Sequence, residues 1–164
     1  MKRVIPALFL MLLLPWSIAY GQQVSLEKIW FGEYTIGETK EILDPKSPTG
    51  KRYESEGTAR VAVQTDTITL RSDMKFGFGY VVRGPRGTID LEHVYFLPDE
   101  SGRASTDREP AFRDIDPSVD GETSFMGWNI SDKADLTRVR TGVYIFQVRY
   151  QNRVLAEQRF NVKR

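Results

Sequence analysis

The sequence contains no cysteine and only one histidine, His93, among its 164 residues. The lack of cysteine excludes a disulfide framework, a thiolate nucleophile and thiolate-bound zinc or iron–sulfur sites. A single histidine excludes a cluster of imidazole ligands. We therefore expect no metal and no other cofactor, and the stability of the protein has to come from its hydrophobic core.

Motifs for nucleotide binding and for serine hydrolysis are also missing. Gly50-Lys51 is followed by Arg52 where a phosphate-binding loop needs Ser or Thr, and Pro45 stands where the first glycine of that loop belongs. No G-x-S-x-G motif supplies a nucleophile for His93. We interpret His93 as a packed or edge residue of a strand, and we expect no catalytic residue.

Charged residues are absent between Arg3 and Glu27. Val4–Trp16 is an apolar run, and the small residues Ala19 and Gly21 follow it. A basic start, a short apolar stretch and a pair of small residues two positions apart are typical of a secretory signal peptide.

We therefore expect residues 1–21 to be a signal peptide and residues 22–164 to form one domain, in the periplasm or outside the cell. An uncleaved membrane anchor is the alternative, but Pro15 interrupts the roughly 20 apolar residues that a span needs. We do not expect an integral membrane protein. Without the two N-terminal bases, 21 Lys and Arg face 22 Asp and Glu, a formal charge of −1. This balance does not favour nucleic-acid binding.

Apolar and polar residues alternate in many places, whereas no stretch repeats apolar residues at helical spacing. Prolines and a glycine predict a loop at Asp44–Gly50, and Gln151-Asn152 is expected to be a two-residue hairpin turn. The alternating runs predict strands at residues 24–36, 57–69, 74–83, 88–97, 122–130, 141–150 and 153–163.

About seven short strands separated by turn signals predict an all-β fold, a single antiparallel β-sandwich. An open barrel is the alternative. The acidic stretch from Pro98 to about Gly121 is expected to be irregular, and one short helical turn is expected near Ser131–Leu136.

Three segments carry a resemblance to a known family. Thr141–Val162 has the form Gly-x-aromatic-x-aromatic-x-Val, a turn, Leu-Ala-Glu and Phe-x-Val. Glu41–Tyr53 contains Asp-Pro-x-Ser-Pro-Thr-Gly-Lys-Arg-Tyr, and Lys75–Tyr80 reads Lys-Phe-Gly-Phe-Gly-Tyr. Together they resemble a bacterial family of domains of unknown function, number 3859, over about Glu33 to Val162. The resemblance implies an immunoglobulin-like sandwich and assigns no catalytic residue.

One acidic motif has the alternating oxygen ligands of a calcium loop: Asp114-x-Asp116-x-Ser118-x-Asp120. An EF-hand also needs Gly at the sixth place and Glu at the twelfth, where this sequence has valine and phenylalanine. An irregular calcium site and a solvated acidic loop both remain open.

Basic residues gather at the C-terminal end, where Arg138–Arg164 holds seven bases and one acid, Glu157. We name Arg149 and Arg153, which flank the hairpin turn, as candidate binding residues for an acidic partner. Head-to-tail association with the acidic stretch 99–122 is a second interpretation. A solvated face that protects an edge strand from aggregation is a third.

Aromatic residues and glycines of the early strands have a specific expected geometry. Trp30 and Phe31 are neighbours, so they point to opposite faces of a sheet and only one of them enters the core. Gly77 and Gly79 lie within a strand pattern and not at a strand-to-helix junction, so they form no dinucleotide fingerprint. We expect them to let an aromatic side chain of a neighbouring strand lie across the backbone.

These observations favour a secreted, non-catalytic binding or protein-interaction module of the bacterial envelope. Its partner would be another envelope protein or an anionic glycan. A self-associating structural or accessory envelope protein is one alternative. A hydrolase that uses a pair of carboxylates, a mechanism that needs neither cysteine nor histidine, is the other.

Overall fold

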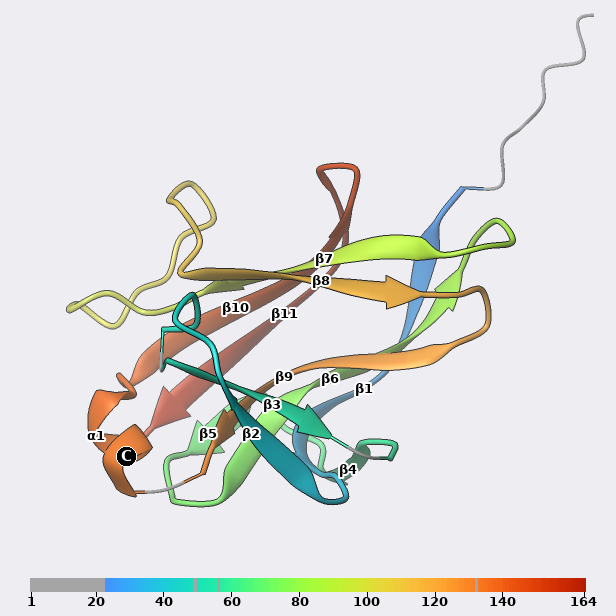
Figure 1. Ribbon diagram of the computed structural model, residues 1–164. Coiled ribbons are helices and arrows are strands. Elements are labelled where there is room, and N and C mark those ends of the chain that lie inside the picture. Colours follow the sequence, from blue (N-terminus) through green and yellow to red (C-terminus); the bar gives the residue numbers. More distant parts are fainter. Residues whose placement is uncertain (1–22, 49, 56, 132) are drawn as a thin grey trace, which may run out of the picture.

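The computed structural model describes residues 23–48, 50–55, 57–131 and 133–164. The predicted signal peptide, residues 1–21, lies outside the described residues. Two β-sheets pack face to face, and a separate hairpin lies across one side of them (Figure 1). Within the described part of the chain, no helix has the length and apolar character to cross a membrane.

The first sheet has four strands in the order β4-β1-β6-β9: β1 (Ser25–Thr35), β4 (Arg60–Val63), β6 (Met74–Arg83) and β9 (Thr123–Ile130). The second has five in the order β5-β11-β10-β7-β8: β5 (Thr67–Thr69), β7 (Ile89–Phe96), β8 (Phe112–Ser118), β10 (Gly142–Tyr150) and β11 (Arg153–Lys163). The hairpin consists of β2 (Thr39–Leu43) and β3 (Lys51–Ser55), and the single described helix is α1 (Lys133–Arg138). All described strand pairs are antiparallel except β5–β11, which is parallel.

The core lies between the two sheets and is dominated by aromatic rings. On β6, every second side chain from Phe76 to Val82 points inward and is fully buried. The ring of Phe76 lies 5.6 Å from that of Phe146 on β10 and 5.2 Å from that of Phe160 on β11. The alternation predicted for these strands is therefore confirmed, because it aligns one face of each sheet with the core.

The predicted hairpin turn and the predicted loop are both confirmed. Gln151 and Asn152 have φ angles of 48° and 64°, so they form the predicted two-residue connection between β10 and β11. Asp44–Gly50 is the predicted loop, in which the Asp44 amide donates to the Gly50 carbonyl at 3.0 Å. The predicted helical turn is present as α1, which starts two residues later than expected.

The strand count is higher than the predicted seven, because the structure describes eleven. The predicted strand 57–69 is two short strands, β4 and β5, which belong to different sheets. Of three further strands, β8 lies in the stretch expected to be irregular, and β2 and β3 flank the predicted loop Asp44–Gly50 and were not predicted. Strands β2 and β8 expose most of their side chains, β3 alternates half-buried with exposed ones, and charged residues are frequent in all three, so none shows an apolar alternation.

The predicted close approach of aromatic rings to glycine is confirmed at one position. Trp30 pairs with Gly79, and a Cβ atom added to Gly79 would collide with the Trp30 indole. Phe31 points to the opposite face and packs against the core. Gly77 has a different role: it faces the backbone of β9, where a Cβ atom would meet the Met126 carbonyl.

Candidate functional site

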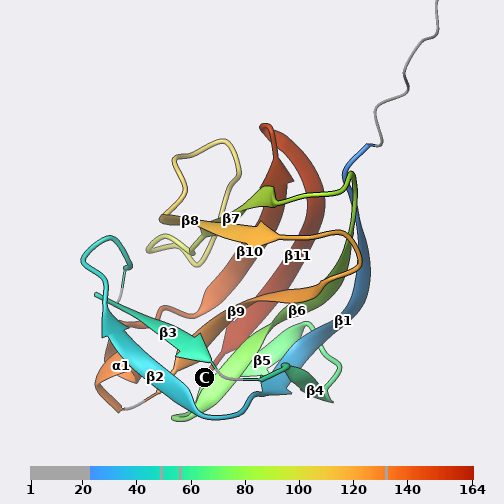
Figure 2. The ribbon, with the colours of Figure 1, turned by 45° about the vertical axis from the view of Figure 1, so that its right-hand side comes forward.

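A cleft of about 300 Å³ lies on the open side of the sandwich, where the edge strands β8 and β9 of the two sheets are neighbours. The hairpin β2–β3 lies across β9 in both ribbon views (Figures 1 and 2). Residues from all three parts line the cleft: Tyr34, Ile36, Thr39, Ser47, Lys51, Arg52, Tyr53, Lys75, His93, Tyr95, Phe112, Asp114, Asp116, Ser124, Phe125, Gly127, Trp128 and Asn129.

The two strands of the hairpin pair with each other and with neither large sheet, so the hairpin is a separate two-stranded sheet. The Tyr53 hydroxyl lies 2.6 Å from the Ser131 hydroxyl, which ties the hairpin to the segment before α1. Two bases of the hairpin are paired within it, since Lys51 contacts Glu41 at 3.1 Å and Arg52 contacts Glu54 at 2.9 Å. The hairpin therefore forms one wall of the cleft while burying little apolar surface of its own.

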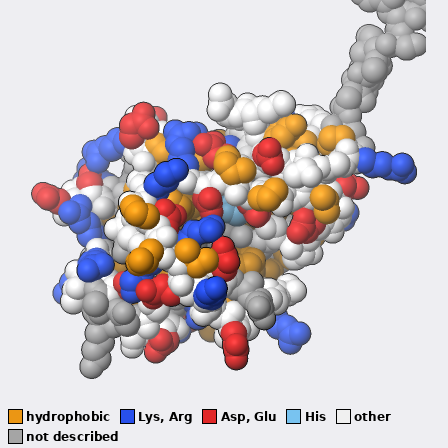
Figure 3. All heavy atoms as spheres, viewed as in Figure 1, with side chains coloured by type: hydrophobic (Ala, Val, Ile, Leu, Met, Phe, Trp, Pro, Cys, Tyr) orange, Lys and Arg blue, Asp and Glu red, His pale blue; other side chains and the backbone are white. Residues whose placement is uncertain are grey.

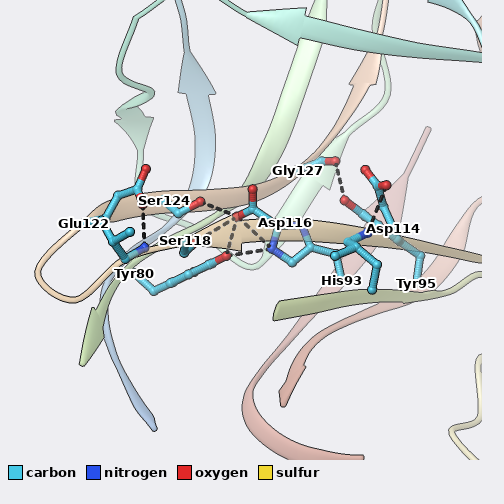
Figure 4. A network of polar contacts seen from close by, with 11 residues as sticks. Tyr80, His93, Tyr95, Asp114, Asp116, Ser118, Glu122, Ser124 and Gly127 are labelled. Carbon is cyan, nitrogen blue, oxygen red and sulfur yellow. Dashed lines mark hydrogen bonds and ion pairs between the residues drawn. The ribbon is translucent and has the colours of Figure 1, made fainter. Parts of the chain in front are cut away.

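A polar network closes the inner end of the cleft between β8 and β9 (Figure 4). The Asp116 carboxylate accepts hydrogen bonds from the Ser124 hydroxyl at 2.7 Å and from the Tyr80 hydroxyl at 3.3 Å. The Tyr80 hydroxyl also lies 2.6 Å from Nε2 of His93. Which of these two groups donates depends on which His93 ring nitrogen carries the proton.

Burial decides the charge state of this network. His93 is 6% exposed, and burial lowers its pKa, although the nearby Asp116 carboxylate opposes that shift. Burial also raises the pKa of Tyr80 far above its usual range. His93 is therefore neutral at pH 7 and packed in a strand, as its alternation predicted. In a Ser-His-Asp triad the serine hydroxyl donates to the histidine. The described serines of this network donate to Asp116 instead, so they do not form such a triad with His93.

Two polar atoms beside the cleft are buried and have no hydrogen-bond partner among the described residues: Nε1 of Trp128 and Oδ1 of Asn129. Trp128 is only 9% exposed. Leaving a buried donor or acceptor unpaired costs about 1–3 kcal/mol. Trp128 and Asn129 are consecutive residues of β9, so their side chains point to opposite faces of the sheet, and each unpaired atom needs its own explanation.

The charges around the cleft are mixed. In the space-filling view of this side, acidic and basic side chains are interspersed with hydrophobic ones (Figure 3). Asp114 and Lys75 both line the cleft, and neither forms an ion pair with another described residue. The cleft therefore offers aromatic walls together with one free charge of each sign.

A second cavity, also of about 300 Å³, shares Trp128 with the cleft as a lining residue. Its lining residues are Pro48, Leu97, Pro98, Ala111, Trp128, Arg138, Val139, Arg140 and Tyr144. They come from the loop between β2 and β3, the ends of the segment between β7 and β8, and the turn after α1.

The acidic motif Asp114–Asp120, for which a calcium site and a solvated loop were both left open, does not form a loop. Asp114, Asp116 and Ser118 lie on strand β8, and Asp120 accepts the Gly84 amide at 3.0 Å. Ser118 is buried, and its hydroxyl is 3.4 Å from Asp116. Among the described residues, no three acidic or histidine side chains gather in a way that could hold a metal ion.

The predicted binding arginines lie outside both cavities, at the β10–β11 turn. Arg149 donates to Oε1 of Gln147 at 2.6 Å and lies over the ring of Phe96 at 5.7 Å. Arg153 donates to the Val24 carbonyl at 2.7 Å. Both side chains make contacts within the protein, and their role in binding stays a prediction.

The comparison with protein families gives one result. The model of the family described as "Domain of unknown function (DUF3859)" matches residues 27–162. The chain belongs to this family. The resemblance read from the sequence is thereby confirmed, and so is its extent over most of the domain. No curated protein matches the chain.

One solved structure supports the fold. The chain resembles the crystal structure of an immunoglobulin-like protein from Pseudomonas aeruginosa, with a TM-score of 0.55 and 18% identity over 86% of this chain and 97% of the other. It also matches part of the alkylpurine DNA glycosylase AlkC from Pseudomonas fluorescens, bound to DNA with an abasic-site analogue. That match has a TM-score of 0.40 and 12% identity over 81% of this chain and 31% of the other. The DUF3859 chain is therefore an all-β, immunoglobulin-like sandwich.

Sequence reasoning missed the cleft as a site. The residues that form it lie far apart in the sequence, from Tyr34 to Asn129. The hairpin forms one wall, and the sequence predicted only its connecting loop, Asp44–Gly50, and neither of its strands. The one available signal was the acidic alternation in residues 114–118, which belongs to an edge strand and not to a metal loop.

Proposed function

We propose that this DUF3859 protein is an exported, non-catalytic binding module whose ligand lies in the cleft between the β2–β3 hairpin, β8 and β9. The observation that carries the proposal is the buried Nε1 atom of Trp128, which has no hydrogen-bond partner among the described residues and belongs to a residue that lines the cleft. A ligand that paired with this donor would offset about 1–3 kcal/mol. The immunoglobulin-like fold by itself assigns no activity.

The composition of the cleft supports binding more than catalysis. Ring systems such as Tyr34 and Phe125 supply contact area, and a few polar groups supply orientation. The Asp116 carboxylate is engaged by Ser124 and Tyr80 within the protein. We expect the partner to be another protein of the bacterial envelope, with an anionic glycan as the alternative.

The experiment is in-cell crosslinking followed by affinity capture of the exported protein from the envelope. Three proteins are compared: the wild type, the cleft variant Asp114→Arg with Lys75→Glu, and the hairpin-turn variant Arg149→Glu with Arg153→Glu. We expect the cleft variant to lose the wild-type partner while the hairpin-turn variant keeps it. Loss in the hairpin-turn variant alone would overturn the cleft proposal and favour the basic hairpin. If the protein captures only further copies of itself, the proposal of a separate partner is overturned and self-association is favoured.

A further inference from the structure

Four of the described strands lie at the edges of the two large sheets: β4, β9, β5 and β8. An unpaired edge invites another strand to pair with it, so natural proteins keep such edges short or block them with proline, charge or bulges. Strands β4 and β5 have only four and three residues. In β8, Pro117 has no N–H, and the Ile115 amide donates to the Asp114 carboxylate at 3.0 Å. Three of the four edges are therefore short or blocked.

Strand β9 is the exception among these edges. It has eight residues, and none of them is charged or a proline. Its register with β6 runs from Thr123 to Ile130 without a bulge. None of the features that protect the other three edges is present in β9. The structure therefore leaves one long open edge, and it belongs to a strand that borders the cleft.

The hydrogen bonds show which backbone groups of β9 face the open edge. Just before β9, the Glu122 carbonyl accepts an amide of β6 at 3.0 Å, so it points toward β6. Backbone groups along an antiparallel strand alternate in direction. The N–H and C=O groups of Phe125, Gly127 and Asn129 therefore point away from β6. In agreement, the Tyr95 hydroxyl of the opposite sheet donates to the Gly127 carbonyl at 3.4 Å.

The open edge is reached through the cleft. Phe125, Gly127 and Asn129 all line it, and each is half-buried. The hairpin β2–β3 lies across β9 in both ribbon views (Figures 1 and 2), but its strands pair only with each other. The hairpin therefore does not pair with the edge of β9. Aromatic side chains border the cleft from two further elements, with Tyr53 on the hairpin and Phe112 on β8.

We propose that the open edge of β9 binds an extended segment of a partner polypeptide, which adds a strand to the four-stranded sheet inside the cleft. Backbone donors and acceptors that recur at every second residue match another β-strand, and strand addition to a sheet edge is an established mode of peptide recognition. Apolar side chains at alternate positions of the segment would contact the aromatic walls. This inference rests on the proposed function, because it names the ligand class of the same site.

A second copy of this protein fits the edge less well than an extended segment does. In a second copy, β9 is itself flanked by its own hairpin and its own β8. Pairing of two β9 edges would bring both hairpins into the same space. An extended segment carries no such neighbours, so it enters the cleft without displacing the hairpin.

Backbone amide signals of the exported protein in ¹H–¹⁵N NMR spectra test the inference. From Phe125 to Asn129 the edge spans four steps of about 3.4 Å, so a hexapeptide covers it. The probes are the acetylated hexapeptide amide Lys-Val-Thr-Val-Thr-Lys and its counterparts with Leu or Phe in place of Val. Each probe is used in two forms. The half-methylated form is N-methylated at the apolar residues and keeps one edge free to pair, whereas the fully methylated form is N-methylated at every residue and has no free edge.

We expect the half-methylated peptides to shift the amide signals of Phe125, Gly127 and Asn129 and to leave those of Arg113 and Ile115 on β8 unchanged. Full methylation should weaken binding tenfold or more, because several backbone hydrogen bonds are lost together. Asn129→Pro removes one amide of the open edge and no bond to β6. It should bind the half-methylated peptides about fivefold more weakly than Asn129→Ala, which keeps that amide.

Other outcomes separate this inference from the proposed function. If fully methylated peptides bind as tightly as half-methylated ones, strand pairing is overturned while the cleft remains a binding site. If only β8 signals shift, or no signal shifts at millimolar probe concentration, the inference is overturned. If the β9 signals shift with protein concentration alone, a second copy occupies the edge and the partner segment is overturned. The capture experiment with the Asp114→Arg and Lys75→Glu variant decides the proposed function separately.

Discussion

At the residue scale, glycines beside aromatic rings set how closely the outer side chains approach the four-stranded sheet. Trp30 lies over Gly79, and Tyr34 lies over Gly127, where an added Cβ atom would collide with the ring. The role of Gly79 was predictable, because a glycine within an alternating strand has few other uses. The role of Gly127 was not, since it depends on a register between β6 and β9 that the sequence does not specify.

Gly79→Ala is expected to lower the free energy of unfolding by about 1–3 kcal/mol, because the methyl group displaces the Trp30 indole. Chemical denaturation measures the effect. In a double-mutant cycle with Trp30→Ala, the cost of Gly79→Ala should fall. Equal costs in both backgrounds would show that the indole does not lie on Gly79.

His93 should make stability depend on pH near neutrality. Burial lowers its pKa in the folded protein, whereas the unfolded chain takes up a proton near pH 6.5. The free energy of unfolding should therefore fall as the pH drops from 7.5 to 5.5, by at most about 1.4 kcal/mol from this group. The groups that face it, Tyr80 and Asp116, stay in place in His93→Gln, which should remove that part of the slope. An unchanged slope in the variant would contradict a buried neutral His93.

At the element scale, the strands that bury a face were predictable and the strands that bury little were not. The inward residues of β6 and β10 give a clear apolar alternation, and both strands lie within one residue of their expected bounds. Edge strand β8 and hairpin strand β2 expose most of their side chains, and three of the five residues of β3 are charged, so no apolar alternation marks these segments as strands. The cleft is built from these charged elements, which explains why it could not be found in advance.

The hairpin should be held over the cleft chiefly by Tyr53. Tyr53→Phe removes the hydroxyl that lies 2.6 Å from Ser131. We expect faster amide hydrogen exchange in β2 and β3, while the global free energy of unfolding changes by no more than about 1.5 kcal/mol. The control is Tyr150→Phe, which removes a hydroxyl outside both cavities. Exchange that is unchanged in β2 and β3 would show that other contacts position the hairpin.

At the scale of the whole molecule, membership of the DUF3859 family and the immunoglobulin-like sandwich were both predictable from the sequence. The family resemblance contributed as much to this as the turn signals did. The two cavities were not predictable, because they form only when two sheet edges, a hairpin and the turn after α1 come together.

Export remains a prediction that an intact-mass measurement checks. Protein recovered from the bacterial envelope should have the mass of residues 22–164, because the small residues Ala19 and Gly21 form the expected cleavage site. A mass that includes the first 21 residues would contradict the predicted signal peptide.

The central claim, that the cleft is the binding site, is tested most directly by site-specific photo-crosslinking in living cells. A photoreactive phenylalanine replaces Phe125, which lines the cleft, or Tyr150, which lies outside both cavities. Both are half-buried aromatic residues, so the two substitutions disturb the fold to a similar extent. We predict a crosslinked partner at position 125 and none at position 150. A partner captured only from position 150, or equally from both, would contradict the claim.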